Sequence, residues 1–206
     1  ELLESLFGIT PALGGSILVE GQAAEIRAPR EAIGSGMALV PEDRKQQGLV
    51  IDMAVADNLS LTSLERDQKS GFLNLKAEEE ISREMLRRMR IKTPTDRQIV
   101  RFLSGGNQQK VVIGKWLAMK PKVLLLDEPT RGIDIGAKQE IYALMEELAE
   151  QGVAILFVSS EMEEVLGMAD RVLVMHEGLL TGELSRSEMS EESIMHFATG
   201  RLGSAA

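Results

Sequence analysis

Uninterrupted aliphatic runs lie in the second half of the sequence, at residues 123–126, 153–158 and 172–175. Between the first two runs, apolar residues recur at helical spacing, at positions 141, 144, 145 and 148. Strands that are apolar on both faces and alternate with helices are typical of parallel sheets covered by helices on both sides. The pattern therefore predicts an α/β fold in which the aliphatic runs are buried parallel strands.

The first fifty residues combine short helices and strands. Residues 1–8 have the apolar spacing of a helix that is already under way at Glu1 and stops at Gly8. Residues 15–21 are interpreted as a short strand that ends in a turn, and residues 37–40 as a strand that runs into Pro41. These strands are expected to belong to the same α/β core.

The pattern changes to helical between about residues 54 and 119. Helices are expected over 54–64 and 76–89, and the triplet Glu78-Glu79-Glu80 fits a solvated helix start. Near the C-terminus, a further strand is expected over 178–184 and a last helix over 190–198. The expected organisation is an α/β core (1–53 and 120–187), a helical subdomain (54–119), and a C-terminal helix and tail (188–206).

Two consecutive carboxylates, Asp127 and Glu128, directly follow the first aliphatic run. Charged groups at the end of a buried strand are costly unless they are paired or bind a metal. At the carboxyl end of a parallel strand they face the crevice in which α/β folds bind ligands. An aspartate there can hold magnesium, and a neighbouring glutamate can orient an attacking water. The alternative is a strand followed by a solvated turn.

A serine and two glycines, Ser104, Gly105 and Gly106, precede an apolar helical pattern that includes Val111 and Trp116. Unpaired backbone N–H groups at a helix start, at the positive end of the helix dipole, form an anion site that glycines leave open. Taken alone, this segment is more often an ordinary glycine-rich cap.

Together the two motifs, LSGGNQQK at 103–110 and LLLDEPTRGID at 124–134, resemble the signature loop, Walker B strand and D-loop of ABC ATPases. The segments VPEDRKQQGL at 40–49 and FVSSEMEEVLGMADRVLVMHEG at 157–178 are similar to the second ATPase domain of bacterial sugar importers of the ribose, galactose, arabinose and xylose type. This resemblance implies a P-loop NTPase core with a mainly parallel sheet and an inserted helical subdomain.

The resemblance also implies a role for each motif residue. Asp127 would position magnesium, and Glu128 would polarise the hydrolytic water. Asp134 would communicate across the interface with an opposing ATPase domain. The signature loop would contact the γ-phosphate of ATP bound on that domain through Ser104, Gly105, Gly106 and Gln108.

Two positions depart from the common family pattern. Glu42 stands where many members have the Q-loop glutamine, and Ser160 stands where they have the switch histidine. Serine can hydrogen-bond a γ-phosphate but offers no imidazole, and a carboxylate near a triphosphate can share a metal but otherwise repels it. The alternative function is therefore a non-hydrolysing half that completes the ATP site of its partner domain.

No G-x-x-x-x-G-K-[ST] motif occurs in the sequence. Residues 1–7 resemble the helix that follows this phosphate-binding loop in the family. We therefore interpret the chain as part of a longer protein, with the Walker A strand and loop in front of Glu1. By family topology, that strand would lie between the strands predicted at 153–158 and 172–175.

The net charge and the lack of long apolar runs restrict the kinds of binding partner that the chain can have. A net charge of −9 over 206 residues argues against binding nucleic acid or an anionic membrane surface. No apolar run approaches the roughly 18 residues of a membrane-spanning helix, so a membrane association would run through a protein partner. A soluble ABC protein of translation or repair fits the importer-like segments less well.

The resemblance implies ATP and Mg²⁺ as ligands, and the import of a monosaccharide from the cytoplasmic face of the bacterial cell membrane. It implies a second ATPase domain and a membrane permease as direct partners, and a periplasmic or extracellular sugar-binding protein as an indirect one. The segment 48–61 is expected to receive the permease.

Overall fold

The structure, a computed structural model, describes residues 1–200. The chain divides into two compact units, Glu1–Val158 and Ser159–Ala206. Of the helices of 54–119, the one at 105–117 packs on the strand at 37–40, and those at 55–60 and 75–88 pack on it in turn, so the helical segment lies in the same unit as the sheet. The expected boundaries at 53, 119 and 187 remain predictions. Within the described residues, no helix has both the length and the apolar character to cross a membrane.

A parallel sheet forms the centre of the first unit. Its strands follow the order β3-β4-β5, with the bounds Met37–Val40, Val123–Asp127 and Ala154–Val158. In the register of the sheet, Leu125 of β4 lies between Leu39 and Leu156 of its neighbours. The strands predicted at 37–40, 123–126 and 153–158 are thus confirmed, and the last two are parallel, as expected.

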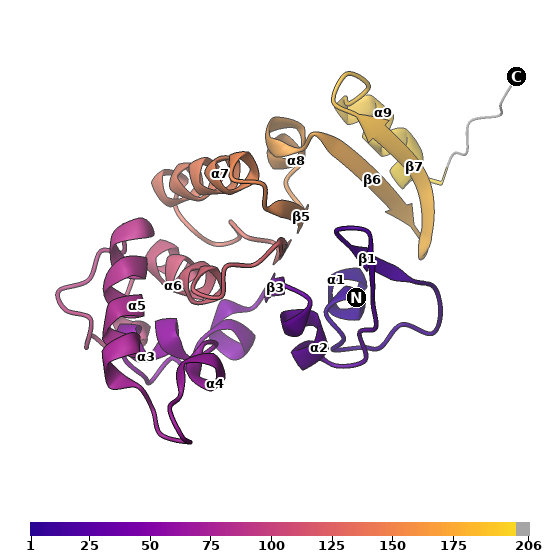
Figure 1. The fold of residues 1–206 in the computed structure, drawn as a ribbon. Coiled ribbons are helices and arrows are strands. Elements are labelled where there is room, and N and C mark those ends of the chain that lie inside the picture. The colour runs from indigo at the N-terminus through magenta and orange to yellow at the C-terminus, as the bar shows by residue number, and fades with distance from the viewer. Residues whose placement is uncertain (201–206) are drawn as a thin grey trace, which may run out of the picture. The chain divides into compact units, whose positions relative to one another are not determined.

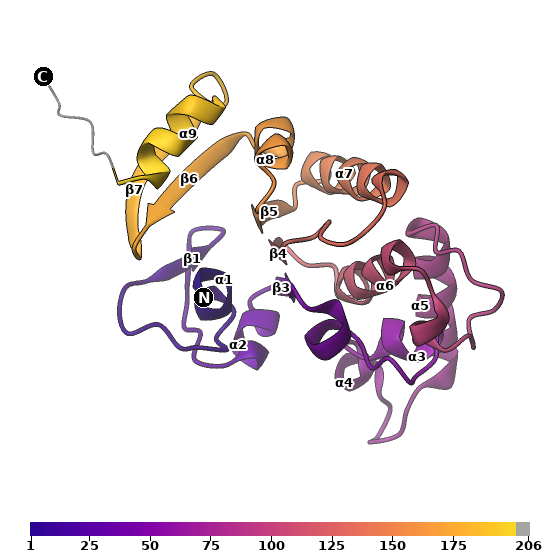
Figure 2. The ribbon, with the colours of Figure 1, turned by 180° about the vertical axis from the view of Figure 1, so that it is seen from behind.

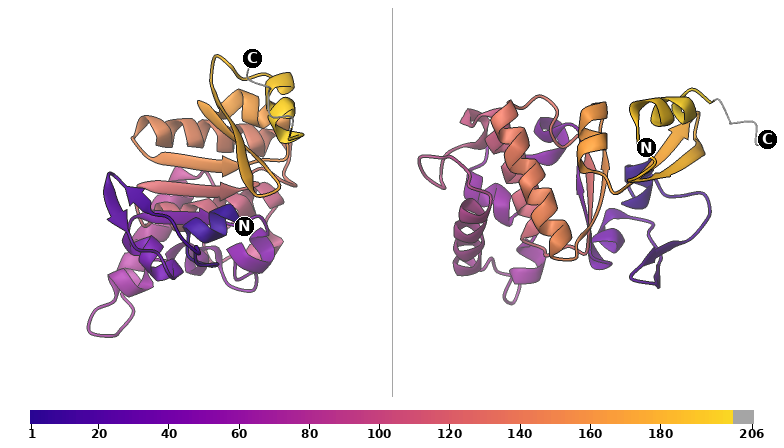
Figure 3. Two further views of the ribbon diagram at one scale, coloured as in Figure 1. Left: turned by 90° about the vertical axis from the view of Figure 1, so that its right-hand side faces the viewer. Right: turned by 90° about the horizontal axis from the view of Figure 1, so that it is seen from above.

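Helices cover both faces of this sheet. Helices α1 (Leu2–Leu6) and α2 (Pro29–Gly34) lie on one face, and α6 (Gly105–Leu117) and α7 (Ile135–Glu150) lie on the other (Figure 1, and from behind in Figure 2). Figure 3 shows the strands between these helices in the view from above. The apolar positions expected on α7 are all buried, at Ile141, Leu144, Met145 and Leu148.

The residues before β3 add a layer to one face of the sheet. A hairpin joins β1 (Ile17–Val19) to β2 (Gln22–Ala24), with Glu20 and Gly21 at positive φ in its turn, as two-residue hairpins require. The core between this layer and the sheet is aliphatic and aromatic, and consists of Leu3, Phe7, Ile26, Ala32, Met37, Leu39 and Leu125.

The segment between β3 and β4 is helical, as expected. Besides α6, it contains a π-helix η1, three α-helices and a 3₁₀ turn η2, with the bounds Arg44–Gly48 (η1), Val55–Ser60 (α3), Leu64–Asp67 (α4), Leu75–Arg88 (α5) and Val100–Phe102 (η2).

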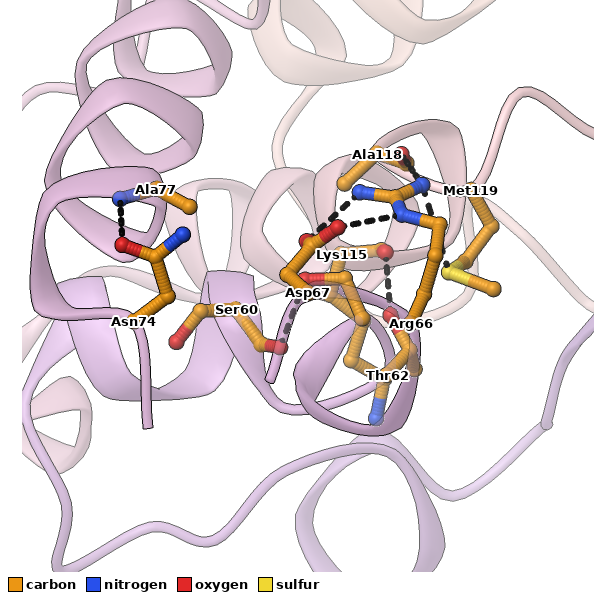
Figure 4. A network of polar contacts seen from close by, with 10 residues as sticks. Ser60, Thr62, Arg66, Asp67, Asn74, Ala77, Lys115, Ala118 and Met119 are labelled. Carbon is orange, nitrogen blue, oxygen red and sulfur yellow. Dashed lines mark hydrogen bonds and ion pairs between the residues drawn. The ribbon is translucent and has the colours of Figure 1, made fainter. Parts of the chain in front are cut away.

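The helix expected over 54–64 ends early, at Ser60. The hydroxyl of Ser63 donates to the carbonyl of Ser60, which offers the backbone an alternative to the next helical turn. The break lets Thr62 donate to the carbonyl of Lys115 at 2.6 Å, and lets Arg66 donate to the carbonyl of Ala118 at 2.8 Å (Figure 4). These two side chains satisfy carbonyls at the end of α6 that have no partner in their own helix.

In its described residues, 159–200, the second unit combines a two-stranded sheet with two helices. Strands β6 and β7 are antiparallel and α9 packs on them, with the bounds Met162–Met168 (α8), Arg171–His176 (β6), Leu179–Ser185 (β7) and Glu191–Ala198 (α9). The strand predicted at 172–175 is confirmed as β6, but its neighbour among the described residues is the antiparallel β7, so its expected parallel pairing remains a prediction. Burial alternates along β6, so that Val174 is buried while Leu173 and Met175 are each 45% exposed. A four-residue aliphatic run cannot distinguish one covered face from two.

The packing of α9 depends on a glycine in β7. A Cβ added to Gly182 would overlap the ring of Phe197, whereas one added to Gly167, in α8, would meet nothing within 4 Å. We expect Gly182→Ala to lower the free energy of unfolding by about 1–3 kcal/mol through overpacking. The control Gly167→Ala should raise it by up to about 1 kcal/mol, since alanine favours a helix over glycine. Equal denaturation midpoints for the two variants would refute this account.

Candidate functional site

The acidic pair lies at the carboxyl end of β4, where Asp127 is the last residue of the strand and Glu128 follows it. The three residues before it, 124–126, are almost completely buried, and Asp127 pairs with Val158 of β5 in the ladder. Asp127 is half-buried. Burial raises the pKa of its carboxyl, and the nearby Glu4 carboxylate raises it further, while the chain's N-terminal ammonium acts in the opposite direction. No lysine or arginine of the described residues pairs with Asp127.

Glu128 has an unusual backbone conformation. Its φ is 47°, in the left-handed region that residues with a side chain rarely adopt. The conformation is held by two hydrogen bonds, because its N–H donates to the carbonyl of Val158 at 2.9 Å and its carbonyl accepts from the N–H of Arg131 at 3.1 Å. Backbone strain of this kind concentrates at functional sites, and here the strained residue is the one at which the chain turns away from the carboxyl end of β4.

Ser104 caps helix α6. Its hydroxyl accepts hydrogen bonds from the backbone N–H and the side-chain amide of Asn107, at 3.4 and 3.0 Å. The side-chain amide oxygen of Asn107 in turn accepts from the N–H of Lys92 at 2.8 Å, which anchors the cap to the rest of the helical segment. Ser104 is exposed, so the cap and the helix start behind it remain accessible to a ligand.

Gly106 brings α6 against the start of α7. A Cβ on Gly106 would overlap the Cβ of Ala137 and would lie 3.6 Å from a carboxylate oxygen of Asp134. Asp134 itself caps α7 by accepting from the N–H of Ala137 at 3.0 Å. The structure thus places the predicted site residues Gly105, Gly106 and Asp134 together, and it gives Gly106 and Asp134 local packing and capping roles as well.

Gln108 points inward. Its side chain is 4% exposed, and its amide donates to the carbonyl of Val100 at 3.2 Å. The amide oxygen is buried without a hydrogen-bond partner among the described residues. Its expected contact with a γ-phosphate remains a prediction, which the inward orientation does not favour. Ser104 is the exposed member of the motif.

The two unusual positions lie in different units. Glu42 follows β3 in the first unit, where its exposed carboxylate forms an ion pair with Arg131. Ser160 lies in the second unit, exposed, in the short loop before α8. Next to it, the Ser159 hydroxyl accepts from the N–H of Glu161 at 3.1 Å and donates to the buried carboxylate of Glu164.

Sequence reasoning missed two cations of this site. Arg44 donates to the carbonyls of Arg131 and Gly132, at 3.0 and 3.4 Å, from a position almost ninety residues earlier in the chain. Lys115, on α6, is 7% exposed, and its ammonium donates to the carbonyl of Gly48. Arg44 lies within the segment 40–49 and Lys115 lies five residues after the motif at 103–110, but no periodicity or spacing distinguishes either from a surface cation.

The arrangement defines a class of protein. A parallel sheet with helices on both faces, an acidic pair at the carboxyl end of a buried strand, and a glycine-rich helix start against the loop after that pair are features of nucleotide-binding domains of the P-loop NTPase class. The chain belongs to the ABC transporter family, because the sequence profile of that family, described as "ABC transporter", matches residues 1–131.

Relatives agree with this assignment. The chain is 50% identical over 200 residues to a ribose import ATP-binding protein, RbsA, of Halalkalibacterium halodurans. It is 48% identical over 203 residues to the RbsA of Oceanobacillus iheyensis. These matches cover 97% and 98% of this chain but only 40% and 41% of the relatives, so the chain spans about two fifths of their length.

Solved structures show the fold. The crystal structure of an ATP-binding cassette of an ABC transporter in its ADP conformation has a TM-score of 0.75 at 22% identity, over 97% of this chain and 82% of that chain. The dimeric post-hydrolysis state of another cassette, bound to ADP and Pi, also has a TM-score of 0.75, at 18% identity, over 90% of this chain and 79% of that chain.

The burial of Lys115 gives a stability test. Burial lowers the pKa of Lys115 from 10.5 to about 8, and no carboxylate of the described residues pairs with it. Below pH 8 the folded protein bears the cost of a buried charge. Between about pH 8 and 10.5 the unfolded chain binds a proton that the folded one has released, so the free energy of unfolding should rise with pH, by up to about 3 kcal/mol.

Lys115→Met should remove this rise, while Lys45→Met, at an exposed position, should keep it. Denaturant unfolding at a series of pH values measures the difference directly, because every other group titrates equally in both variants. Parallel curves for the wild type and Lys115→Met from pH 8 to 10.5 would show that Lys115 does not carry the effect.

Proposed function

We propose that the chain is an ATP-binding and ATP-hydrolysing domain of an ABC importer for a monosaccharide of the ribose class. The observation that carries the proposal is the acidic pair Asp127-Glu128 at the end of a buried strand, together with the glycine-rich start of α6, which packs against the loop that follows the pair. The relatives named as ribose import ATP-binding proteins, 50% identical over 97% of this chain, support the choice of substrate class.

Asp127 fits a magnesium ligand. A half-buried carboxylate without a cationic side chain beside it gains stability from a bound cation, and burial already raises its pKa. Magnesium bound there would neutralise charge on the nucleotide phosphates. Glu128, one residue on, would orient the attacking water, since its turn at the sheet edge directs the chain out of the ladder.

Ser104 and the N–H groups of Gly105 and Gly106 would bind the γ-phosphate of ATP held by an opposing ATPase domain. An exposed cap at the positive end of a thirteen-residue helix suits an anion. In this proposal a second ATPase domain is the direct partner, the permease receives the energy at the cytoplasmic face of the bacterial membrane, and a sugar-binding protein outside the membrane delivers the sugar.

A second candidate is a half that completes the partner's ATP site without hydrolysing its own ATP. Glu42 favours it, because a carboxylate engaged with Arg131 is poorly placed to hold a metal or water. Ser160 favours it too, since a serine cannot act as an imidazole would. The intact acidic pair favours hydrolysis instead. We therefore expect this domain to hydrolyse ATP slowly, beside a more active partner domain.

Substitution at the acidic pair and the cap distinguishes the two candidates. In the intact transporter, Glu128→Gln should lower turnover only partly, by about two- to tenfold, because the partner site continues to work. Ser104→Arg should abolish turnover, since a bulky cation fills the anion site, whereas Ser104→Thr keeps the hydroxyl cap and should retain activity. Complete loss of ATPase activity with Glu128→Gln, at unchanged ATP affinity, would mean that this site carries the main chemistry.

The permease is expected to dock on the segment from Gly48 to Leu61. Leu49 is buried, but the side chain of Val50 is 42% exposed. The fully buried Asn58 fixes this orientation, because its amide accepts from the N–H of Val50 at 2.9 Å and donates to the carbonyl of Val50 at 3.0 Å. Asp52, also exposed, forms an ion pair with Arg101 just before the signature loop.

Val50→Asp should therefore uncouple transport while sparing basal ATPase activity, because a carboxylate in an apolar contact is desolvated without a partner. Leu18→Asp is the matched control, since Leu18 is also an exposed apolar residue but lies on β1. Sugar uptake and ATP hydrolysis would be measured on the same membranes at equal protein abundance. Normal uptake with Val50→Asp would exclude this docking site.

A further inference from the structure

The π-helix η1 connects β3 to the helical segment. Its first turn is capped by Asp43, whose carboxylate accepts from the N–H groups of Lys45 and Gln46 at 2.9 and 3.0 Å. A π-helix is rare and is found mostly as a single turn, frequently at functional sites. Both ends of η1 are attached to residues outside it.

The first end is attached by Arg44 to the loop that follows the acidic pair. One terminal nitrogen of its guanidinium donates to the carbonyl of Arg131 at 3.0 Å, and the other donates to the carbonyl of Gly132 at 3.4 Å. The neighbouring Glu42 carboxylate pairs with the side chain of Arg131. Three contacts therefore join the segment 42–44 to residues 131–132.

Arg44 also contacts the start of α6. A Cβ on Gly105 would lie 2.9 Å from a terminal nitrogen of Arg44, so the guanidinium lies directly against the backbone of Gly105. Its Nε is buried and has no hydrogen-bond partner among the described residues. A buried donor of this kind is costly, and the contacts of the two terminal nitrogens offset that cost.

The second end of η1 is attached to the middle of α6. The Lys115 ammonium donates to the carbonyl of Gly48, and a Cβ on Gly48 would lie 3.0 Å from a methyl group of Val112. The π-helix thus spans from the loop at 131–132 to α6, with the helix start at Gly105 beside its first residue.

We infer that Arg44 is a positioning residue that holds the loop after Glu128 and the start of α6 in one fixed arrangement. Through the carbonyls of Arg131 and Gly132, it sets the direction in which the loop leaves Glu128. Through its contact with Gly105, it ties that direction to the helix start that binds phosphate. Without Arg44, Glu128 would keep its position at the strand end but lose alignment with the attacking water. This inference rests on the proposed ATP hydrolysis.

The contact of Arg44 with the two carbonyls of Arg131 and Gly132 needs a planar guanidinium group. The two terminal nitrogens of arginine reach separate carbonyls, whereas the single ammonium of lysine can serve only one of them at a time. Arg44→Lys should therefore resemble Arg44→Ala more than the wild type. Lys45→Ala is the matched control, because it removes the same charge from the next residue, which is exposed and whose ammonium has no hydrogen bond or ion pair among the described residues.

The kinetic test uses the intact transporter. Arg44→Ala should lower kcat for ATP hydrolysis by about tenfold or more, with the KM for ATP changed less than about twofold, as expected when alignment and not binding is lost. Millimolar guanidinium, far below denaturing concentrations, should restore part of kcat in Arg44→Ala but not alter Lys45→Ala. Hydrogen exchange of the intact ATP-binding protein provides a readout that needs no activity: amides at 104–107 and 130–134 should exchange faster in Arg44→Ala, while those of β4 stay protected.

The outcomes separate the inference from the proposed function. If the wild-type transporter does not hydrolyse ATP, the proposed function fails. Hydrogen exchange alone then tests whether Arg44 holds the loop at 131–132 and the start of α6 together. If the wild type is active and Arg44→Ala matches Lys45→Ala in kcat and in exchange, the positioning role is wrong. Faster exchange throughout β3, β4 and β5 in both Arg44→Ala and Arg44→Lys would also overturn it, since Arg44 would then serve general stability.

Discussion

The site depends on the close contact of two helix starts, at Gly106 of α6 and Ala137 of α7. The contact leaves no room for a Cβ on residue 106, so the two helices meet at their first turns. An ion pair between the buried Lys110 and Glu140 continues the same contact one turn further along both helices. Because each helix carries its capping residue at that end, the contact places Ser104 and Asp134 on the same side of the molecule's first unit.

The contact between the two helix starts also restricts the loop at the carboxyl end of β4. Helix α7 begins only a few residues after β4 ends, so the position of its first turn fixes the loop that contains Glu128. That loop begins with a positive φ at Glu128 and contains another at Gly132, whose carbonyl accepts from Arg44. A short strained loop with both ends attached has few alternative conformations, which suits the proposed role of Glu128 in orienting a water molecule.

Local patterns predicted most of the elements. The strands at 123–127 and 154–158 and the helix between them produce long apolar periodicities, and the motifs identified the family and the acidic pair. The break after Ser60 was missed because it depends on a hydroxyl bonding back to the chain, which hydrophobic spacing does not register. The strand at 171–176 was expected to be buried on both faces, but Leu173 and Met175 are exposed in this structure although they are apolar.

The tertiary contacts of the site could not be read from the sequence. Arg44 and Lys115 look like ordinary surface cations, yet each donates to a carbonyl more than sixty residues away. Gln108 belongs to a motif whose neighbours are accessible, but its position on the first turn of α6 turns it inward toward Val100. The position of Gln108 around the helix sets its direction, and the distant carbonyls set the directions of Arg44 and Lys115. The spacing of residues in a motif contains neither kind of information.

The most direct test of this account is a double-mutant cycle between Gly106 and Ala137, measured as free energies of unfolding. Gly106→Ala alone should cost about 1–3 kcal/mol from overpacking, and Ala137→Gly alone about 1 kcal/mol from helix propensity. If the two helix starts meet as described, the double variant should be more stable than Gly106→Ala alone, because removing one methyl group makes room for the other. A double variant whose cost equals the sum of the two single costs would contradict the contact on which the site depends.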